Sequence, residues 1–141
     1  MKKIILYFIL GVMLVILGAA IYFGSYANVV KQITIPVTVE ITDNNRKMGL
    51  NVDTDALHFG TMGRGSTSGR FVDINNTGEF PVTVELSGHG PMGKYIVFEE
   101  SDFFLDIDDS RHLGIDLAIP IYQSLGKSTG SVKILFKRVR E

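Results

Sequence analysis

The chain of 141 residues contains three histidines and no cysteine. His58, His89 and His112 lie far apart, at separate turns or strand ends of the predicted structure. A zinc site built on one element needs two histidines a few residues apart, and thiolate ligands need cysteine. The sequence meets neither condition, and without cysteine it also has no disulfide. We therefore expect no metal centre and no cofactor.

The acidic residues suggest a second metal chemistry, an oxygen site for calcium. Asp53 and Asp55 form one close pair, and Asp106, Asp108 and Asp109 form a second group. Several carboxylates in one loop are ligands that Ca²⁺ prefers, but the twelve-residue EF-hand loop with its final glutamate is absent. Two interpretations stay open at this point, calcium-binding loops and hydrated acidic loops.

Two further motifs fail the tests for catalysis. Residues 63–69, Gly-Arg-Gly-Ser-Thr-Ser-Gly, are rich in glycine and hydroxyl groups, as phosphate-binding loops are. A P-loop, however, ends in Gly-Lys-Ser/Thr and opens a helix, whereas Gly69 is followed by arginine and a predicted strand. No Gly-x-Ser-x-Gly elbow of a serine hydrolase occurs either. We predict that the protein is not an enzyme.

One modification signal is specific enough to name. Asn75, Asn76 and Thr77 form an Asn-x-Thr acceptor sequence without an intervening proline. Asn75 is therefore a candidate glycosylation site if this part of the chain is exported. Turn chemistry explains the same residues without a glycan, because asparagine favours tight turns. Both interpretations stay open.

Export is indicated by the apolar N-terminus. Residues 4–23 are twenty consecutive positions without a charge, preceded by Lys2 and Lys3. A helix of this length spans about 30 Å, the thickness of the hydrocarbon core of a bilayer. We predict a single-pass transmembrane helix in the cell membrane. The two lysines hold residues 1–3 in the cytoplasm and place the C-terminal part outside it.

A cleaved secretory signal is the alternative for this segment. Gly18 and Ala20 provide the small residues that a signal peptidase needs, so a cut after Ala20 is chemically reasonable. The apolar run continues past that point through Ile21, Tyr22 and Phe23, which favours a retained anchor. Both alternatives send the same remainder across the membrane.

Beyond the anchor we expect a juxtamembrane linker, 24–32, and one extracytoplasmic domain, 33–141. Apolar residues alternate with polar ones over residues 33–42, which is typical of a half-buried strand, and Pro36 predicts a sheet edge or a bulge there. Similar alternation recurs about every ten residues with glycine-rich turns between, including 60–69 and 126–130. Seven to nine strands so spaced indicate an all-β, immunoglobulin-like antiparallel β-sandwich. The 14 basic and 15 acidic residues are interspersed, which argues against a nucleic-acid partner.

The strand end Leu57-His58-Phe59-Gly60 begins a series of turn motifs that resembles a known group of domains. The series continues with Gly65, the strand 70–74, the turn Asn76-Thr77-Gly78-Glu79-Phe80-Pro81 and a late Pro120–Gly126–Gly130 pattern. It is similar to the major-sperm-protein and ASH-type immunoglobulin-like β-sandwiches of bacterial and archaeal surface proteins. The resemblance implies adhesion, scaffolding or subunit assembly. On physical grounds we expect Gly78 to supply a positive φ and Pro81 to stiffen the re-entry into the next strand.

Two functions follow from this layout. The first is a membrane-anchored module with a structural or protein-binding role in the cell envelope. The alternative is a pilin-like or stator-like subunit of a surface filament that assembles through its N-terminal helix. The expected partners are the lipid bilayer, contacted by the helix, and either another protein or further copies of the chain.

Overall fold

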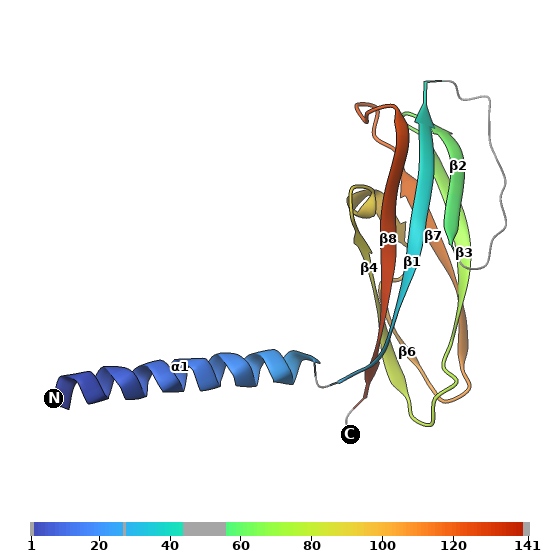
Figure 1. The fold of residues 1–141 in the computed structure, drawn as a ribbon. Coiled ribbons are helices and arrows are strands. Elements are labelled where there is room, and N and C mark those ends of the chain that lie inside the picture. The colour runs from blue at the N-terminus through green and yellow to red at the C-terminus, as the bar shows by residue number, and fades with distance from the viewer. Residues whose placement is uncertain (1, 27, 44–55, 140–141) are drawn as a thin grey trace.

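The structure is a computed structural model that describes residues 2–26, 28–43 and 56–139. It contains an N-terminal helix, α1 (Lys2–Tyr26), followed by eight strands within the described residues (Figure 1). The strands are β1 (Val29–Thr42), β2 (Leu57–Gly63), β3 (Thr67–Asn75), β4 (Val82–His89), β5 (Ile96–Phe98), β6 (Asp102–Leu105), β7 (Ser110–Ala118) and β8 (Gly126–Arg138). A short 3-10 helix, η1 (Gly93–Tyr95), lies before β5.

Helix α1 projects away from the strands as a separate rod (Figure 1). Its segment Tyr7–Gly24 is long and apolar enough to cross a membrane, and none of it is buried against the rest of the chain. The helix extends beyond the predicted span 4–23, and β1 begins at Val29. Only residues 27 and 28 therefore separate α1 from β1, where the sequence predicted a linker over 24–32.

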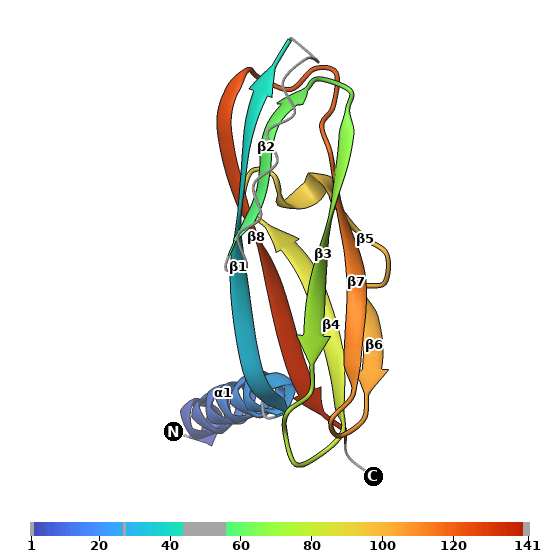
Figure 2. The same cartoon turned by 90° about the vertical axis from the view of Figure 1, so that its right-hand side faces the viewer.

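The strands form two sheets that share one core (Figure 2). The first has five strands in the order β2-β1-β8-β4-β6, and the second has three in the order β3-β7-β5. The mostly-β fold with two sheets and one apolar N-terminal helix confirms the coarse prediction from alternation. A predicted strand around Leu50 and Val52 lies outside the described residues.

The prediction of an entirely antiparallel sandwich is wrong at one pair of strands. β1 and β2 run parallel, with Val37 opposite Leu57 and Thr42 opposite Gly63. A tight hairpin needs only two to five residues, whereas parallel neighbours need a crossover of about a dozen or more. The fourteen residues 43–56 between the two strands satisfy the second requirement. The length of this connection was the sequence signal for parallel pairing.

The turn predicted at residues 126–130 is also misplaced, because β8 begins at Gly126 and the turn covers residues 119–125. Gly130 lies inside β8, where an added Cβ would come within 3.0 Å of the His89 carbonyl oxygen. Glycine inside a strand often marks a close backbone approach. Gly88 and Gly93 meet in the same way, since a Cβ on Gly88 would lie 2.2 Å from the Gly93 carbonyl oxygen.

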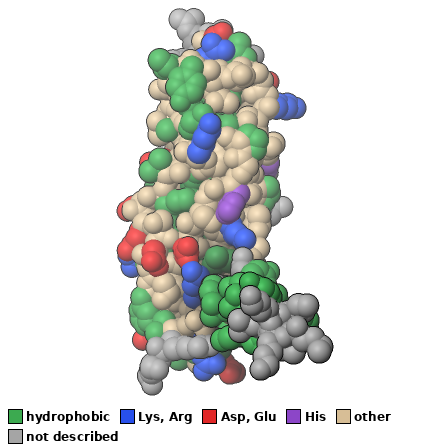
Figure 3. Space-filling view, turned by 90° about the vertical axis from the view of Figure 1, so that its left-hand side faces the viewer, with side chains coloured by type: hydrophobic (Ala, Val, Ile, Leu, Met, Phe, Trp, Pro, Cys, Tyr) green, Lys and Arg blue, Asp and Glu red, His purple; other side chains and the backbone are tan. Residues whose placement is uncertain are grey.

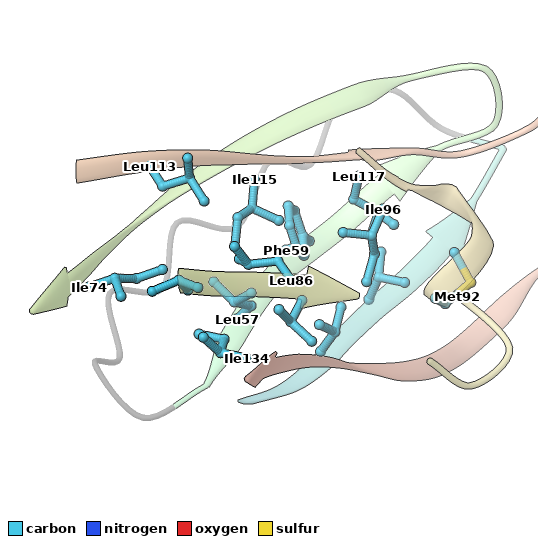
Figure 4. Packing of buried hydrophobic residues seen from close by; sticks show 14 of the residues in the cluster. Leu57, Phe59, Ile74, Leu86, Met92, Ile96, Leu113, Ile115, Leu117 and Ile134 are labelled. Atoms are coloured by element: carbon cyan, nitrogen blue, oxygen red, sulfur yellow. The ribbon is translucent and has the colours of Figure 1, made fainter. Parts of the chain in front are cut away.

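The core consists of alternate apolar side chains from both sheets (Figure 4). Val84, Ile115, Leu117 and Val132 are completely buried, and Met92 fills the space beneath η1. Each buried aliphatic side chain contributes about 1.5–3 kcal/mol relative to an exposed one. The described residues leave no buried side-chain nitrogen or oxygen without a hydrogen-bond partner.

We predict that Ile115→Asp prevents folding, because the carboxylate would replace a side chain with 0% exposure and have no cationic partner. Asp116→Asn, at the neighbouring exposed position of β7, is the matched control and should change the free energy of unfolding by less than about 0.5 kcal/mol. Thermal unfolding followed by circular dichroism measures both variants. An unchanged melting temperature for Ile115→Asp would contradict the packing described here.

Candidate interaction surfaces

The sandwich has two ends. The helix-proximal end is where β1 begins and β8 ends, and the distal end is where β1 ends and β8 begins (Figure 1). At the distal end, the turn between β2 and β3 is bonded to the loop between β7 and β8. The Gly65 N–H donates to the Ile119 carbonyl at 2.8 Å, and the Ile119 N–H donates to the Ser66 carbonyl at 2.8 Å. Gly65 adopts a φ of 73°, which glycine permits as the chain passes from one sheet to the other.

The loop anchored in this way, residues 119–125, presents apolar side chains to solvent. Ile121 is 76% exposed, Tyr122 is 78% exposed and Leu125 is 50% exposed. We call these three side chains the distal apolar cluster. Grouped apolar exposure of this kind is typical of protein-contact surfaces. The sequence analysis missed the cluster, although an apolar Ile-Tyr pair directly after Pro120 was a usable signal.

At the helix-proximal end, Asn76 joins two turns. Its side-chain amide donates to the carbonyls of Phe80 at 3.0 Å and Asp106 at 3.0 Å, and more weakly to Leu105 at 3.4 Å. Its backbone N–H donates to the Asp109 carbonyl at 2.9 Å. Asn76 is 5% exposed and is the one buried polar residue in the described part of the chain. It therefore ties the β3–β4 turn to the β6–β7 turn.

The role predicted for Gly78 is wrong. Among the described glycines, positive φ occurs at Gly60, Gly65, Gly90 and Gly126, and Gly78 is not one of them. Its N–H instead donates to Asn76 Oδ1 at 3.1 Å, and an added Cβ would lie 3.2 Å from the same oxygen. The turn needs a small residue beside Asn76, and the Asn-x-Gly sequence provides it without a left-handed backbone.

Asn75 has the opposite environment from its neighbour. It is the last residue of β3, opposite Ser110 of β7, and its side chain is exposed. Thr77 of the acceptor sequence is exposed as well. The structure thus brings the acceptor amide to the surface, and glycosylation of Asn75 stays a prediction.

The acidic residues do not converge in the described part of the chain. Asp106, Asp108 and Asp109 occupy the exposed turn between β6 and β7, where Asp106 Oδ1 accepts the Ile107 N–H at 2.8 Å. Asp53 and Asp55 lie outside the described residues. No three histidine or carboxylate side chains in ranges 2–26, 28–43 and 56–139 are grouped to hold a metal ion.

The three histidines lie on different strands and contact different neighbours. His58 Nδ1 is 2.5 Å from Thr38 Oγ1, next to a shallow hollow of about 400 Å³ on the outer face of the five-stranded sheet. His89 Nε2 is 3.0 Å from Ser87 Oγ. On the opposite face of the molecule, His112 Nδ1 lies 2.7 Å from Asp73 Oδ1, and its ring stacks on Phe71 with centroids 4.8 Å apart. The contacts of His58 and His112 join paired strands, whereas that of His89 lies within β4, and no two histidines come together.

The outer face of the five-stranded sheet carries many small polar side chains (Figure 3). Threonine and serine occupy outward positions of three adjacent strands, among them Thr34, Thr38, Ser87, Thr129 and Ser131. Charged side chains gather lower on this face, where Lys137 is paired with Glu85 across β8 and β4. The outward serine and threonine side chains give this face many hydrogen-bonding groups.

Pro36 lies where β1 changes from a central to an edge strand. β8 pairs with β1 from Val29 to Ile41, but β2 pairs with it only from Val37 to Thr42. Among the described residues, the segment from Val29 to Pro36 therefore has a strand neighbour on one side only. The predicted edge position of Pro36 is confirmed for this half of β1.

Comparison with protein-family models, with curated proteins and with solved structures finds no significant match to this chain.

We predict that Asn76→Ala lowers the free energy of unfolding by about 2–3 kcal/mol, because it removes the side-chain bonds that join the two turns and leaves part-buried carbonyls unpaired. For a domain of this size the melting temperature should fall by about 10 °C. Asn75→Ala, at the exposed neighbouring position, is the control and should melt like the unmodified chain. Equal melting temperatures for the two variants would contradict the role assigned to Asn76.

Proposed function

We propose that the protein is a single-pass membrane protein whose β-sandwich stands outside the cytoplasm as a protein-binding domain of the cell envelope. The domain is of the immunoglobulin-like type that the turn motifs resemble. The observation that carries this proposal is the junction of two unlike parts. An apolar helix with no buried surface is joined by two residues to a domain with a core of its own.

The exposure of α1 supports the membrane anchor. Its large apolar side chains are mostly more than half exposed, including Leu14 at 63%, Val15 at 72% and Phe23 at 70%. A helix that is hydrophobic all round needs an apolar environment on every side, and the sandwich covers none of it. A lipid bilayer provides that environment over the full length of the helix.

The direction of insertion follows from the charges that flank α1. Lys2 and Lys3 precede the apolar segment, and the first cation after it is Lys31 in β1. Lysine near a membrane-spanning helix favours the cytoplasmic side. The N-terminus is therefore cytoplasmic and the sandwich lies on the other side.

Protein binding is supported by the surface of the sandwich. The distal apolar cluster exposes three large side chains at the end of the domain opposite the junction with α1. The described residues hold no cluster suited to a metal ion. A domain with this surface contributes contacts, and its function is to position a partner relative to the membrane.

Single-cysteine labelling tests the topology cleanly, because the chain contains no cysteine of its own. We predict that Ser124→Cys, in the exposed distal loop, reacts with a membrane-impermeant maleimide in intact cells. Lys3→Cys is the matched control and should react only after the membrane is permeabilised. Labelling is measured by the mass shift of the protein recovered from the membrane fraction.

The opposite labelling pattern would overturn the proposed orientation. Recovery of a chain that lacks α1 would overturn the retained anchor in favour of a cleaved signal. A processed N-terminus together with long assemblies in detergent extracts would favour the filament subunit over the anchored module.

A further inference from the structure

The half of β1 next to the helix leaves the core partly open. Val37, Val39 and Ile41 are exposed by 0%, 4% and 2%, and this is the half that β2 flanks. Ile33 and Ile35 point to the same face of the same strand but are only half-buried. The difference in burial coincides with the presence or absence of a strand beside β1 (Figure 2).

The backbone on this edge has no strand partner among the described residues. The Thr42 carbonyl accepts the Arg64 N–H, so the backbone groups of Thr42 point to the β2 side of β1. In a strand every second residue directs its N–H and C=O groups to the same side. Gln32 and Thr34 therefore direct theirs to the β2 side as well. The β8 ladder gives the same assignment. The Thr129 carbonyl accepts a bond from Met92 on the side of β8 away from β1. The even-numbered residues Val132 and Ile134 therefore face β1, where their partners are Ile35 and Ile33. Pro36, which lacks an N–H, interrupts only the open edge.

A small cavity lies at the foot of this edge. It has a volume of about 130 Å³ and is lined by Val30 and Lys31 of β1, by the 75–78 turn, and by Phe80, Val82 and Phe136. Two cations lie at its aromatic walls. Lys31 Nζ is 5.8 Å from the Phe136 ring centroid, and the Arg138 guanidinium is 4.5 Å from that of Phe80. Within the described residues neither cation forms an ion pair.

We propose that this edge binds an extended strand of a partner protein, which pairs with Gln32 and Thr34 and completes the five-stranded sheet. We refer to residues 30–36 of β1 with the adjoining cavity as the acceptor edge. The strand has apolar side chains at alternate positions, which cover Ile33 and Ile35 and fill the cavity. A carboxylate on the strand lies beside Lys31 and Arg138. The proposal rests on the proposed function in one respect, since it specifies the kind of partner that the anchored domain binds.

A second copy of the chain is the competing occupant of this edge. Pairing between two copies of β1 would protect the Gln32 and Thr34 amides in a dimer without added peptide, which distinguishes it from the binding of a partner strand.

The residues that connect β1 to β2 between 44 and 55 lie outside the described residues. Hydrogen exchange at the Gln32 and Thr34 amides tests whether this connection covers the edge, because coverage would protect both amides without added peptide.

The test uses the full chain in detergent micelles and a fluorescent peptide, Thr-Ile-Thr-Ile-Thr-Ile-Asp, together with the version that has aspartate at its N-terminus. Anisotropy titration should give saturable binding of at least one peptide with a Kd below about 1 mM. Replacing the aspartate by lysine should weaken binding at least about fivefold, because it removes the contact with Lys31 and Arg138. No saturation of either peptide would overturn the proposal.

A backbone variant and its control establish that the peptide binds the acceptor edge. Thr34→Pro removes one N–H from the open edge and none from the β8 ladder, as Pro36 already does, so the melting temperature should change by less than about 3 °C. Peptide binding should weaken at least about tenfold. Thr34→Ala keeps the N–H and should bind within about twofold of the unmodified chain. Equal binding by both variants would overturn the proposed site.

Amide hydrogen exchange keeps the proposal testable if the proline variant does not fold. In the unmodified chain the Gln32 and Thr34 amides should exchange rapidly and become protected when peptide is added. The Ile33 and Ile35 amides should be protected in both states. Protection of Gln32 and Thr34 without peptide, in monomers or in dimers, would show that the chain covers its own edge and would overturn the proposal. None of these readouts depends on membrane topology, so failure here is distinguishable from failure of the labelling test.

Discussion

The antiparallel ladder between β1 and β8 is the interaction on which the rest of the structure depends. It runs from Val29 to Ile41 on one strand and from Gly126 to Lys137 on the other, nearly the full length of the domain. β8 also pairs with β4 along its other edge, so the last strand is the central strand of the five-stranded sheet and connects β1 to β4. β1 in turn continues directly into α1. A pull on the helix is therefore carried by many backbone hydrogen bonds acting together.

The two ends of the sandwich are closed by different means. At the distal end, backbone bonds between the 64–66 turn and the 119–125 loop are sufficient, and the apolar side chains of that loop stay outside. At the helix-proximal end, a single buried side chain, Asn76, satisfies carbonyls of both turns. A buried amide with satisfied hydrogen bonds fixes geometry that apolar packing alone leaves less specific. The end next to the helix is thus joined through a buried polar side chain, whereas the described part of the distal end is joined through backbone bonds and presents the distal apolar cluster.

The sequence was sufficient to predict the strands but not to predict which strands pair. Period-two alternation located the described strands, because burial of one face leaves a local signature in each strand. Strand pairing is non-local, so the parallel partner of β1 was missed although the long 43–56 connection signalled it. The Asn75-Asn76 pair shows the same limit at one site. Two identical residues side by side have opposite environments, and only the approach of the β6–β7 turn distinguishes the buried Asn76 from the exposed Asn75. Glycine was equally ambiguous, marking a close approach at Gly130 and a true turn at Gly65.

The position of the acceptor edge restricts the partner that can use it. The acceptor edge begins four residues after Tyr26, the last residue of α1, so at about 3.3 Å per residue Pro36 lies no more than roughly 33 Å from the end of the helix. An unpaired terminal segment, or the membrane-proximal part of another anchored chain, can pair with an edge this close to the proposed membrane without bringing a folded domain against it. A flexible segment loses conformational entropy when it pairs. Its affinity must therefore come from burial of apolar side chains in the cavity and from contacts with Lys31 and Arg138. These two contributions also make the edge selective for its partner.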